Sequence, residues 1–493
     1  MPLGRVLNVA RRGSRRHHVS WPPRHRSGTS PNSFSAPLRS RTGSGGGNPL
    51  RCPLYNVFIG YINVPGDIGP TAQALEAKVP KAGFDEAKRL QGTLLKRYLE
   101  SLWAGAAAGR KFAYTFVMGN PIELLSAFGI VPVFPEVTCL NISYRGGAPG
   151  LIAASEEEGY STDACGYVKM GVGAALKGGQ TPIGNIPRPD ILLLNYSGCQ
   201  IYIHWWEQLH YLTGAPIYTV DVPYIREYDG RVPPHDIDYV VGQLKELIPD
   251  LEKATGSPFD EEALREAIDR SREAWDLWRQ CLETGTLRPT PFDAYFESIY
   301  YMSPITLLRG TAECVDFYRF LLDELHRRHE AGVGPTKDEK FRIIFEGVPN
   351  YPYFKSFWDL FKKWDARCVA STYPKVAGMV DSGSFRLDPG RPLESLAEYM
   401  IHAYCNLNMI GRVGLLERYV KDYQADGMII HAIKSCRSFS MGHGDIREHF
   451  AKELDVPTLL IESDHVDPRY YSEAQMRNRV DAFFETLALR KRR

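Results

Sequence analysis

The chain has 493 residues, of which 44% are hydrophobic and 24% charged, and its formal net charge is +1. This length and hydrophobic content suffice for two or three domains with well-packed cores. Residues 1–51 contain ten arginines and no Asp, Glu or Lys, so subtracting these ten charges leaves the remaining body at −9, which argues against nucleic-acid binding. No apolar run reaches about 18 residues, so we expect no membrane span.

The N-terminal segment, residues 1–51, is rich in Arg, Ser, Gly and Pro and lacks apolar periodicity, which predicts a disordered basic tail. An organelle presequence or a twin-arginine export signal at Arg11 and Arg12 is an alternative, but no apolar segment follows these arginines. We therefore expect a cytoplasmic protein. Residues 52–110 are predicted to form an N-terminal helical arm, because leucines recur at helical spacing between 90 and 102.

Two segments of alternating strands and helices follow. Apolar runs separated by helical sequence predict a first α/β domain at 111–235, in which VPVFPEV (131–137) is interpreted as the second strand. Residues 236–335 are predicted to be a helical segment. Strands return in a second α/β domain at 336–493, with FRIIFEG, ARCVAST, DGMIIHAI and PTLLIES. The fold class is therefore α/β, with two Rossmann-like parallel-sheet domains joined by helices.

Three of the nine cysteines occur among small residues where a loop should begin: Cys165 in YSTDACGYVK, Cys199 in NYSGC and Cys436 in IKSCRSFS. The last two follow apolar strands, and a thiolate at a strand's carboxyl end lies where open α/β sheets bind ligands. The spacing alone does not establish a metal site, because the chain has no C-x-x-C pair and an odd number of dispersed cysteines. By spacing alone, buried structural thiols are the favoured interpretation.

The remaining cysteines are weaker candidates. Cys139 follows a predicted strand end and is the alternative ligand, whereas core packing is expected for the cysteines in helical or strand sequence, namely Cys281, Cys314, Cys368 and Cys405. Lys169, close to Cys165, is a cation available to phosphates or to a reduced metal centre. The sequence contains no G-x-G-x-x-G after a clear strand and no G-x-x-x-x-G-K-[ST], so we expect no dinucleotide or ATP site in this chain.

Two further motifs carry polar candidates. In HWWEQLH, His204, Glu207 and His210 recur every three residues, but on a helix the outer two diverge by about 120°. A packing helix is therefore favoured over a metal site, while Glu207 stays a candidate because it closely follows Cys199. In ESDHVDPRYYS, His465 follows the last predicted strand and is a candidate proton donor. The alternative is that this segment simply begins the final helix.

From about Phe112 to the C-terminus, the chain resembles the cluster-bearing subunits of the family that includes ATP-driven benzoyl-CoA reductase and the 2-hydroxyacyl-CoA dehydratases. The resemblance is carried by five segments, GNPIELLSAFGIVP, EEEGYSTDACGYVK, LLLNYSGC, DYQADGMIIHAIKSCRSFS and ESDHVDPRYYS. The segment PTPFDAYFESIYYMSPITLLRGTAE, which begins at Pro289, is most similar to the benzoyl-CoA reductase branch.

This resemblance implies that Cys165, Cys199 and Cys436 hold a [4Fe-4S] cluster whose fourth iron has an exchangeable ligand or one from a partner. It further implies a related cluster-bearing partner subunit and a separate ATPase subunit pair, which binds ATP and delivers electrons for reduction of benzoyl-CoA to a cyclic dienoyl-CoA. Two alternatives stay open: a subunit of a 2-hydroxyacyl-CoA dehydratase, and a non-catalytic scaffold that lacks the cluster.

Overall fold

The computed structural model describes residues 84–197, 199–227, 231–376 and 385–492. The predicted basic tail at 1–51 and residues 52–83 of the predicted helical arm, including Cys52, lie outside the described residues. Within the arm, the expected amphipathic helix is present as α2 (Glu86–Ala107), which buries Leu94 and Leu102.

Four parallel strands form the first sheet, in the order β2-β1-β3-β4. They are β1 (Phe112–Tyr114), β2 (Val131–Val133), β3 (Ile191–Tyr196) and β4 (Ile217–Asp221). Its helices are α3 (Ile122–Ala127), α4 (Pro135–Tyr144), α5 (Ala148–Glu157), α6 (Gly166–Leu176) and α7 (Ile201–Thr213). The second strand is shorter than predicted because Pro135 begins α4: proline suits the first turn of a helix and cannot donate to a sheet.

The second sheet repeats this arrangement, in the order β6-β5-β7-β8, again with all strands parallel. Its strands are β5 (Phe341–Gly347), β6 (Ala366–Ser371), β7 (Gly427–Ile433) and β8 (Thr458–Ser463). Its helices are α13 (Phe354–Lys362), α14 (Tyr373–Val376), α15 (Pro392–Ile401), α16 (Met409–Asp422), α17 (Arg437–Ser440), α18 (His443–Glu448) and α19 (Glu473–Lys491). The predicted fold class, two parallel α/β sheets, is confirmed.

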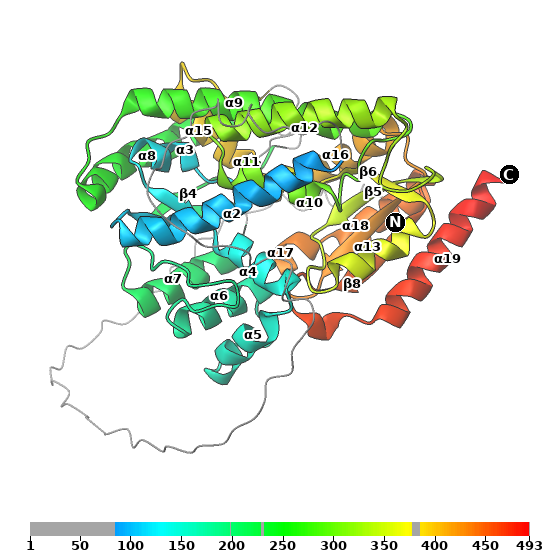
Figure 1. Cartoon of the computed structure of the whole chain (residues 1–493), viewed down its shortest axis with the longest axis horizontal. Coiled ribbons are helices and arrows are strands. Elements are labelled where there is room, and N and C mark those ends of the chain that lie inside the picture. The colour runs from blue at the N-terminus through cyan, green and yellow to red at the C-terminus, as the bar shows by residue number, and fades with distance from the viewer. Residues whose placement is uncertain (1–83, 198, 228–230, 377–384, 493) are drawn as a thin grey trace, which may run out of the picture. The chain divides into compact units, whose positions relative to one another are not determined.

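Helices connect the two sheets, as predicted. They are α8 (Pro234–Thr255), α9 (Glu261–Glu283), α10 (Ser298–Tyr301), α11 (Ser303–Leu307) and α12 (Ala312–Glu330). The long helices α9 and α12 pack along each other, and α2 contacts α10, α11 and α12 (Figure 1). Where one domain ends and the next begins stays a prediction. Among the described helices, none is both long enough and apolar enough to cross a bilayer.

Both sheets have the same topological switch point. In the first sheet β2 lies on one side of β1, and the chain then crosses over to place β3 on the other side, so the switch point lies between β1 and β3. In the second sheet β6 and β7 lie on opposite sides of β5, and the switch point lies between β5 and β7. Ligands of open α/β sheets bind at the carboxyl ends of strands at such a point. Cys199 lies three residues beyond β3, and Cys436 lies three residues beyond β7. The two cysteines therefore occupy equivalent positions on the two sheets.

A buried ion pair holds the loop after β1 against the connecting helices. The Arg309 and Glu123 side chains are fully buried, with Arg309 Nε 2.6 Å from Glu123 Oε1. The same guanidinium donates to the Asn120 carbonyl at 2.8 Å and to the Tyr399 hydroxyl at 2.9 Å. This cluster joins α3, the loop before α12 and α15, and it fixes the loop that follows β1.

Removal of one partner of this pair should be costly. Glu123→Ala leaves the Arg309 charge buried and unpaired, so we expect the free energy of unfolding to fall by about 3–5 kcal/mol. The matched control is Glu266→Ala, which removes an exposed partner of Arg270 and should cost less than about 1 kcal/mol. Urea unfolding of the two variants measures both values. Equal losses would contradict a structural role for the buried pair.

Candidate functional site

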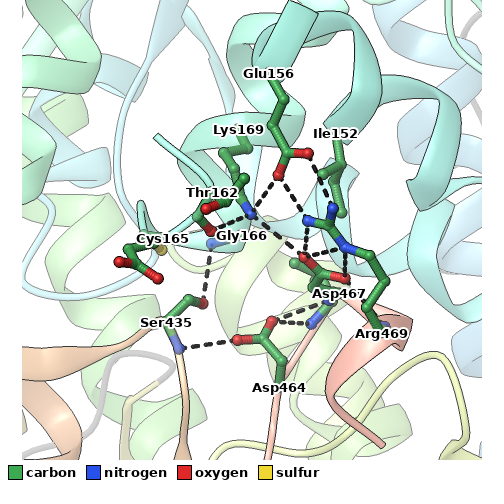
Figure 2. Close-up of polar contacts among 12 residues, drawn as sticks. Ile152, Glu156, Thr162, Cys165, Gly166, Lys169, Ser435, Asp464, Asp467 and Arg469 are labelled. Carbon is green, nitrogen blue, oxygen red and sulfur yellow. Dashed lines mark hydrogen bonds and ion pairs between the residues drawn. The ribbon is translucent and has the colours of Figure 1, made fainter. Parts of the chain in front are cut away.

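The loops that carry Cys165 and Cys436 are joined by a hydrogen bond. Cys165 is the N-cap residue of α6, and Cys436 is the N-cap residue of α17. The backbone N–H of Gly166 donates a hydrogen bond to Ser435 Oγ at 3.1 Å (Figure 2). This hydrogen bond links the residue after Cys165 to the residue before Cys436. Two cysteines separated by 271 positions in the sequence, at 165 and 436, therefore lie at one junction between the two α/β halves.

Asp464 stabilises this junction by accepting backbone hydrogen bonds from two loops. Its buried carboxylate accepts the backbone N–H of Ser435 at 3.0 Å and those of Val466 and Asp467 at 3.1 and 3.0 Å. Gly166 has to be glycine, because a Cβ there would lie 2.4 Å from Val466 Cγ2 and 3.1 Å from Asp464 Oδ1. The start of α6 thus packs directly on the loop that follows β8.

A buried ion network reinforces the same contact. Lys169, one helical turn after Cys165, is fully buried, and its Nζ donates to Glu156 at 3.0 Å, to the Thr162 carbonyl at 2.8 Å and to Asp467 at 3.3 Å. The Arg469 guanidinium donates hydrogen bonds to both Glu156 and Asp467 (Figure 2). All three ammonium donors of Lys169 are occupied within the protein. The expectation that Lys169 is available to a phosphate or to a metal centre is therefore wrong.

The loop that carries Cys199 contacts α15 and the segment that follows it. Ser197 Oγ donates to the Met400 carbonyl at 3.4 Å. Gly119, which has a φ of +62°, is wedged between the two halves: a Cβ there would lie 2.6 Å from Ser197 Oγ and 3.3 Å from Ala403 Cβ. Cys199 therefore lies in a loop packed against the segment that follows α15.

The three candidate cysteines interact electrostatically. Burial is the main cause that raises the pKa of each thiol, to about 11 for Cys436. The charge of Cys436 further raises the pKa of Cys165, and the charges of both raise that of Cys199. Backbone N–H groups in the first turns of α6 and α17 act in the opposite direction on Cys165 and Cys436. Burial raises the pKa of the other buried thiols as well, and without a cation beside them Cys165, Cys199 and Cys436 stay protonated.

Four other cysteines are buried differently. Each donates its thiol to a backbone carbonyl, at 3.6 Å for Cys139, 3.8 Å for Cys281, 3.5 Å for Cys314 and 3.2 Å for Cys368. A thiol that donates such a hydrogen bond is protonated and already has a hydrogen-bond partner, as is typical of cysteines in a protein core. Among the described residues, none of Cys165, Cys199 and Cys436 makes such a bond. Cys139 is thus a less suitable ligand than the sequence alone suggested.

The cysteines are not gathered around a single ion. Within the described parts of the chain, no group of three or more His, Cys, Asp or Glu side chains is close enough to hold one metal ion. A single ion needs ligand atoms about 2.3 Å from it, and hence about 4 Å from one another.

His465 lies at the junction, and its role as a proton donor stays a prediction. Its Nε2 lies 3.9 Å from Cys165 Sγ, its Nδ1 lies 3.3 Å from Asp464 Oδ1, and its ring meets Tyr167 edge-on. Burial lowers the pKa of His465, although the Asp464 carboxylate opposes this effect. A neutral imidazole with one nitrogen directed at the sulfur is therefore the favoured state.

Glu207 is not brought to the cysteines. Its side chain is 56% exposed on α7 and pairs with His204, with 3.0 Å between Glu207 Oε2 and His204 Nδ1. His210 instead lies with Nδ1 2.7 Å from the Ala215 carbonyl at the end of the helix. The three residues thus diverge around α7, in agreement with a helix that packs through its buried Trp205.

Glu136 is a polar residue of the site that the sequence analysis missed. It is buried in the first turn of α4, where its Oε2 accepts the Val117 N–H at 2.6 Å and its Oε1 accepts the Tyr202 hydroxyl. Burial raises the pKa of Glu136, and its charge raises the pKa values of Cys199 and Cys436. The signal that could have found it is Pro135, because proline is common at the first position of a helix. A helix that begins at Pro135 places Glu136 just after β2, at the carboxyl edge of the sheet.

Comparisons with known proteins show the family to which the chain belongs. The 2-hydroxyglutaryl-CoA dehydratase D-component family matches residues 118–487. The chain is 41% identical to a benzoyl-CoA reductase subunit of Thauera aromatica over 387 residues, which are 77% of this chain and 89% of that protein. It is 27% identical to the (R)-phenyllactyl-CoA dehydratase alpha subunit of Clostridium sporogenes over 376 residues, 75% and 88% of the two chains. The beta subunit of the same enzyme is 25% identical over 265 residues, 51% and 64% of the two chains.

The resemblance inferred from the motifs is thereby confirmed. The matched region, residues 118–487, includes all three candidate cysteines. These relatives are all named as subunits, so this chain is similar to components of multi-subunit enzymes.

Overpacking at Gly166 should open the junction. In Gly166→Ala the new methyl group collides with Val466, so we expect the free energy of unfolding to fall by about 1–3 kcal/mol. Gly150→Ala, in the open space around α5, is the matched control and should be neutral or stabilising by up to about 1 kcal/mol. Urea unfolding of the metal-free protein measures both. A neutral Gly166→Ala would show that α6 does not pack tightly on the loop after β8.

Proposed function

Because the chain belongs to the 2-hydroxyglutaryl-CoA dehydratase D-component family, we propose that it is the iron–sulfur subunit of an ATP-dependent benzoyl-CoA reductase. In this proposal the chain works with a related cluster-bearing subunit, and a separate ATPase subunit pair binds ATP and supplies electrons. The substrate is benzoyl-CoA and the product a cyclic dienoyl-CoA.

The observation that carries this proposal is the difference in identity between two kinds of relative. Over nearly the same span, the chain is considerably more similar to the subunit of a benzoyl-CoA reductase than to the subunit of a dehydratase. Both kinds share the family, so the family alone supports only an acyl-CoA reductase or dehydratase type of subunit.

Cys165, Cys199 and Cys436 are the residues that would hold the cluster. The donor set fits, because three mutually interacting thiols lie beside helix starts at the carboxyl ends of the sheets. When bound, a [4Fe-4S] cluster supplies single electrons at low potential, as the stable aromatic ring requires. His465, with Nε2 directed at the Cys165 sulfur, would orient this ligand and adjust the charge on it.

Ring reduction to the diene also consumes two protons for its two electrons. Glu136 is suited to donate a proton, because its raised pKa favours the protonated acid in a buried site. The Tyr202 hydroxyl and the Val117 N–H hold the carboxyl group in a fixed orientation. We propose Glu136 rather than Glu207 for this step, because Glu207 is exposed on α7.

The runner-up function is a subunit of a 2-hydroxyacyl-CoA dehydratase, in which the substrate's oxygen would bind the open iron. The two functions are separated by supplying the anaerobically purified complex, with ATP and a reductant, with benzoyl-CoA or with a 2-hydroxyacyl-CoA. We expect ATP-dependent consumption of benzoyl-CoA with formation of the dienoyl-CoA. Turnover of the hydroxyacyl-CoA alone would assign the dehydratase function instead.

The third possibility, a scaffold without a cluster, is tested by metal analysis. We expect Cys199→Ser to reduce the iron and acid-labile sulfide of the complex by the amount of one cluster. Cys314→Ser is the matched control, because its thiol is bonded to the Pro304 carbonyl in the connecting helices, and it should leave both contents unchanged. Equal iron in the wild type and in Cys199→Ser would favour the scaffold.

The proton-donor role is tested at Glu136. Glu136→Gln keeps the size of the side chain and one acceptor oxygen for the Val117 N–H but removes the acidic proton, so benzoyl-CoA reduction should fall by about 100-fold or more. Iron content should not change. Glu207→Gln is the control and should keep wild-type rates. A fully active Glu136→Gln would remove this residue from the mechanism.

A further inference from the structure

A buried carboxylate at the switch point of the second sheet has no part in the proposed mechanism so far. Glu346 lies at the carboxyl end of β5, beside β7, and its side chain is fully buried. Its carboxylate accepts hydrogen bonds from the Tyr404 hydroxyl at 3.1 Å, from the Thr372 hydroxyl and from the Arg412 guanidinium at 2.7 Å. These donors belong to three separate segments of the second half, so they fix the carboxylate in place.

The surroundings of Glu346 favour its ionised form. Burial opposes ionisation, but His443, whose Nε2 lies 3.8 Å from Glu346 Oε1, and the charge of Arg412 lower the pKa of Glu346 to about 2. The Arg412 side chain is itself only 9% exposed. The carboxylate and the guanidinium therefore form a buried pair whose net charge is zero.

The same guanidinium holds the turn that begins at Cys436. Arg412 donates to the Phe439 carbonyl at 3.2 Å and lies over the Phe439 ring, 5.1 Å from its centroid. Phe439 belongs to the one-turn helix α17, whose N-cap residue is Cys436, and the Ser440 N–H closes this turn by donating to the Cys436 carbonyl at 3.1 Å. A helical turn rises only about 5.4 Å, so Arg412 contacts the turn that carries Cys436 itself.

An unopposed positive charge on this turn would be unfavourable for the proposed chemistry. The charge around an iron–sulfur cluster is one of the factors that set its reduction potential, and a nearby cation stabilises the more negative, reduced form. Reduction of an aromatic ring needs an electron donor of low potential. The Glu346 carboxylate cancels the charge of Arg412 and leaves the hydrogen bond from Arg412 to the Phe439 carbonyl in place.

We propose that Glu346 is a positioning residue that keeps the reduction potential of the cluster low, because its carboxylate neutralises the Arg412 guanidinium that holds the Cys436 turn. The inference rests on the proposed function and deepens it, since it concerns the same cluster site. Glu346 and Arg412 themselves exchange neither an electron nor a proton. The electron passes from the ATPase subunit pair to the cluster and from the cluster to the ring.

The test is an anaerobic redox titration of the complex, monitored by electron paramagnetic resonance (EPR), with the wild type and with Glu346→Gln. The amide keeps the size of the side chain and an acceptor oxygen but removes the negative charge, so Arg412 is left uncompensated. We expect the equilibrium constant for one-electron reduction of the cluster to rise at least about tenfold, which corresponds to a shift of about 59 mV toward positive potential. The iron content should stay the same.

Glu324→Gln is the matched control. Glu324 forms a buried pair with Arg328, 2.6 Å away, within α12 of the connecting helices, so both variants lose the carboxylate of a buried ion pair. Only Glu346→Gln should move the potential. Glu346→Asp keeps the charge and should titrate like the wild type. Clusters of the partner subunits contribute the same background to every sample, so only shifts between samples are interpreted.

An unchanged potential in Glu346→Gln, at wild-type iron content, would overturn the inference and leave the proposed function intact. An equal shift in Glu324→Gln would also overturn it, because the effect would then follow from lost stability. If Glu346→Gln does not assemble, the double variant with Arg412→Gln lacks both charges and should titrate like the wild type, and a positive shift in it would contradict the inference. If Cys199→Ser leaves the iron content unchanged, the proposed cluster itself fails, which distinguishes the two failures.

Discussion

The hydrogen bond between the Gly166 N–H and Ser435 Oγ is the contact on which the site depends. Helix α6 belongs to the first sheet and Ser435 to the second, so this contact joins the two halves that carry Cys165 and Cys436. Asp464 fixes the acceptor side through the Ser435 N–H, and the buried Lys169 fixes the donor side through Asp467. Because Gly166 leaves no room for a side chain, the start of α6 lies directly against the loop that follows β8.

The two sheets contribute to the site in the same way. Each has its switch point beside the strand that precedes a cysteine, β3 for Cys199 and β7 for Cys436. Backbone N–H groups and buried acids converge on this edge, and Glu136 and Asp464 lie close enough to affect the thiols' pKa values. The site therefore combines thiols that need a cation, a carboxyl group that favours its protonated form, and a neutral imidazole. The proposed function would use these groups for coupled electron and proton delivery.

The strands and their parallel arrangement could be predicted from the sequence, because runs such as DGMIIHAI place apolar residues on both faces of a strand. The convergence of Cys165 with Cys436 could not be predicted from local pattern, since it depends on contacts between loops that are distant in the sequence. Glu136 was missed because VPVFPEV reads as a strand until Pro135 is recognised as a helix start. The environment of Lys169 was misjudged for a related reason: its three partners lie on other elements or loops, which local sequence does not reveal.

The most direct test of the account is the location of iron in an experimental structure of the anaerobic complex, by anomalous scattering at the iron absorption edge. The account predicts an iron peak at the junction of the two halves, with the sulfur atoms of Cys165, Cys199 and Cys436 each about 2.3 Å from an iron atom, as is typical of metal–thiolate bonds. An iron peak elsewhere in this chain, or a Cys436 sulfur directed away from the other two, would contradict it.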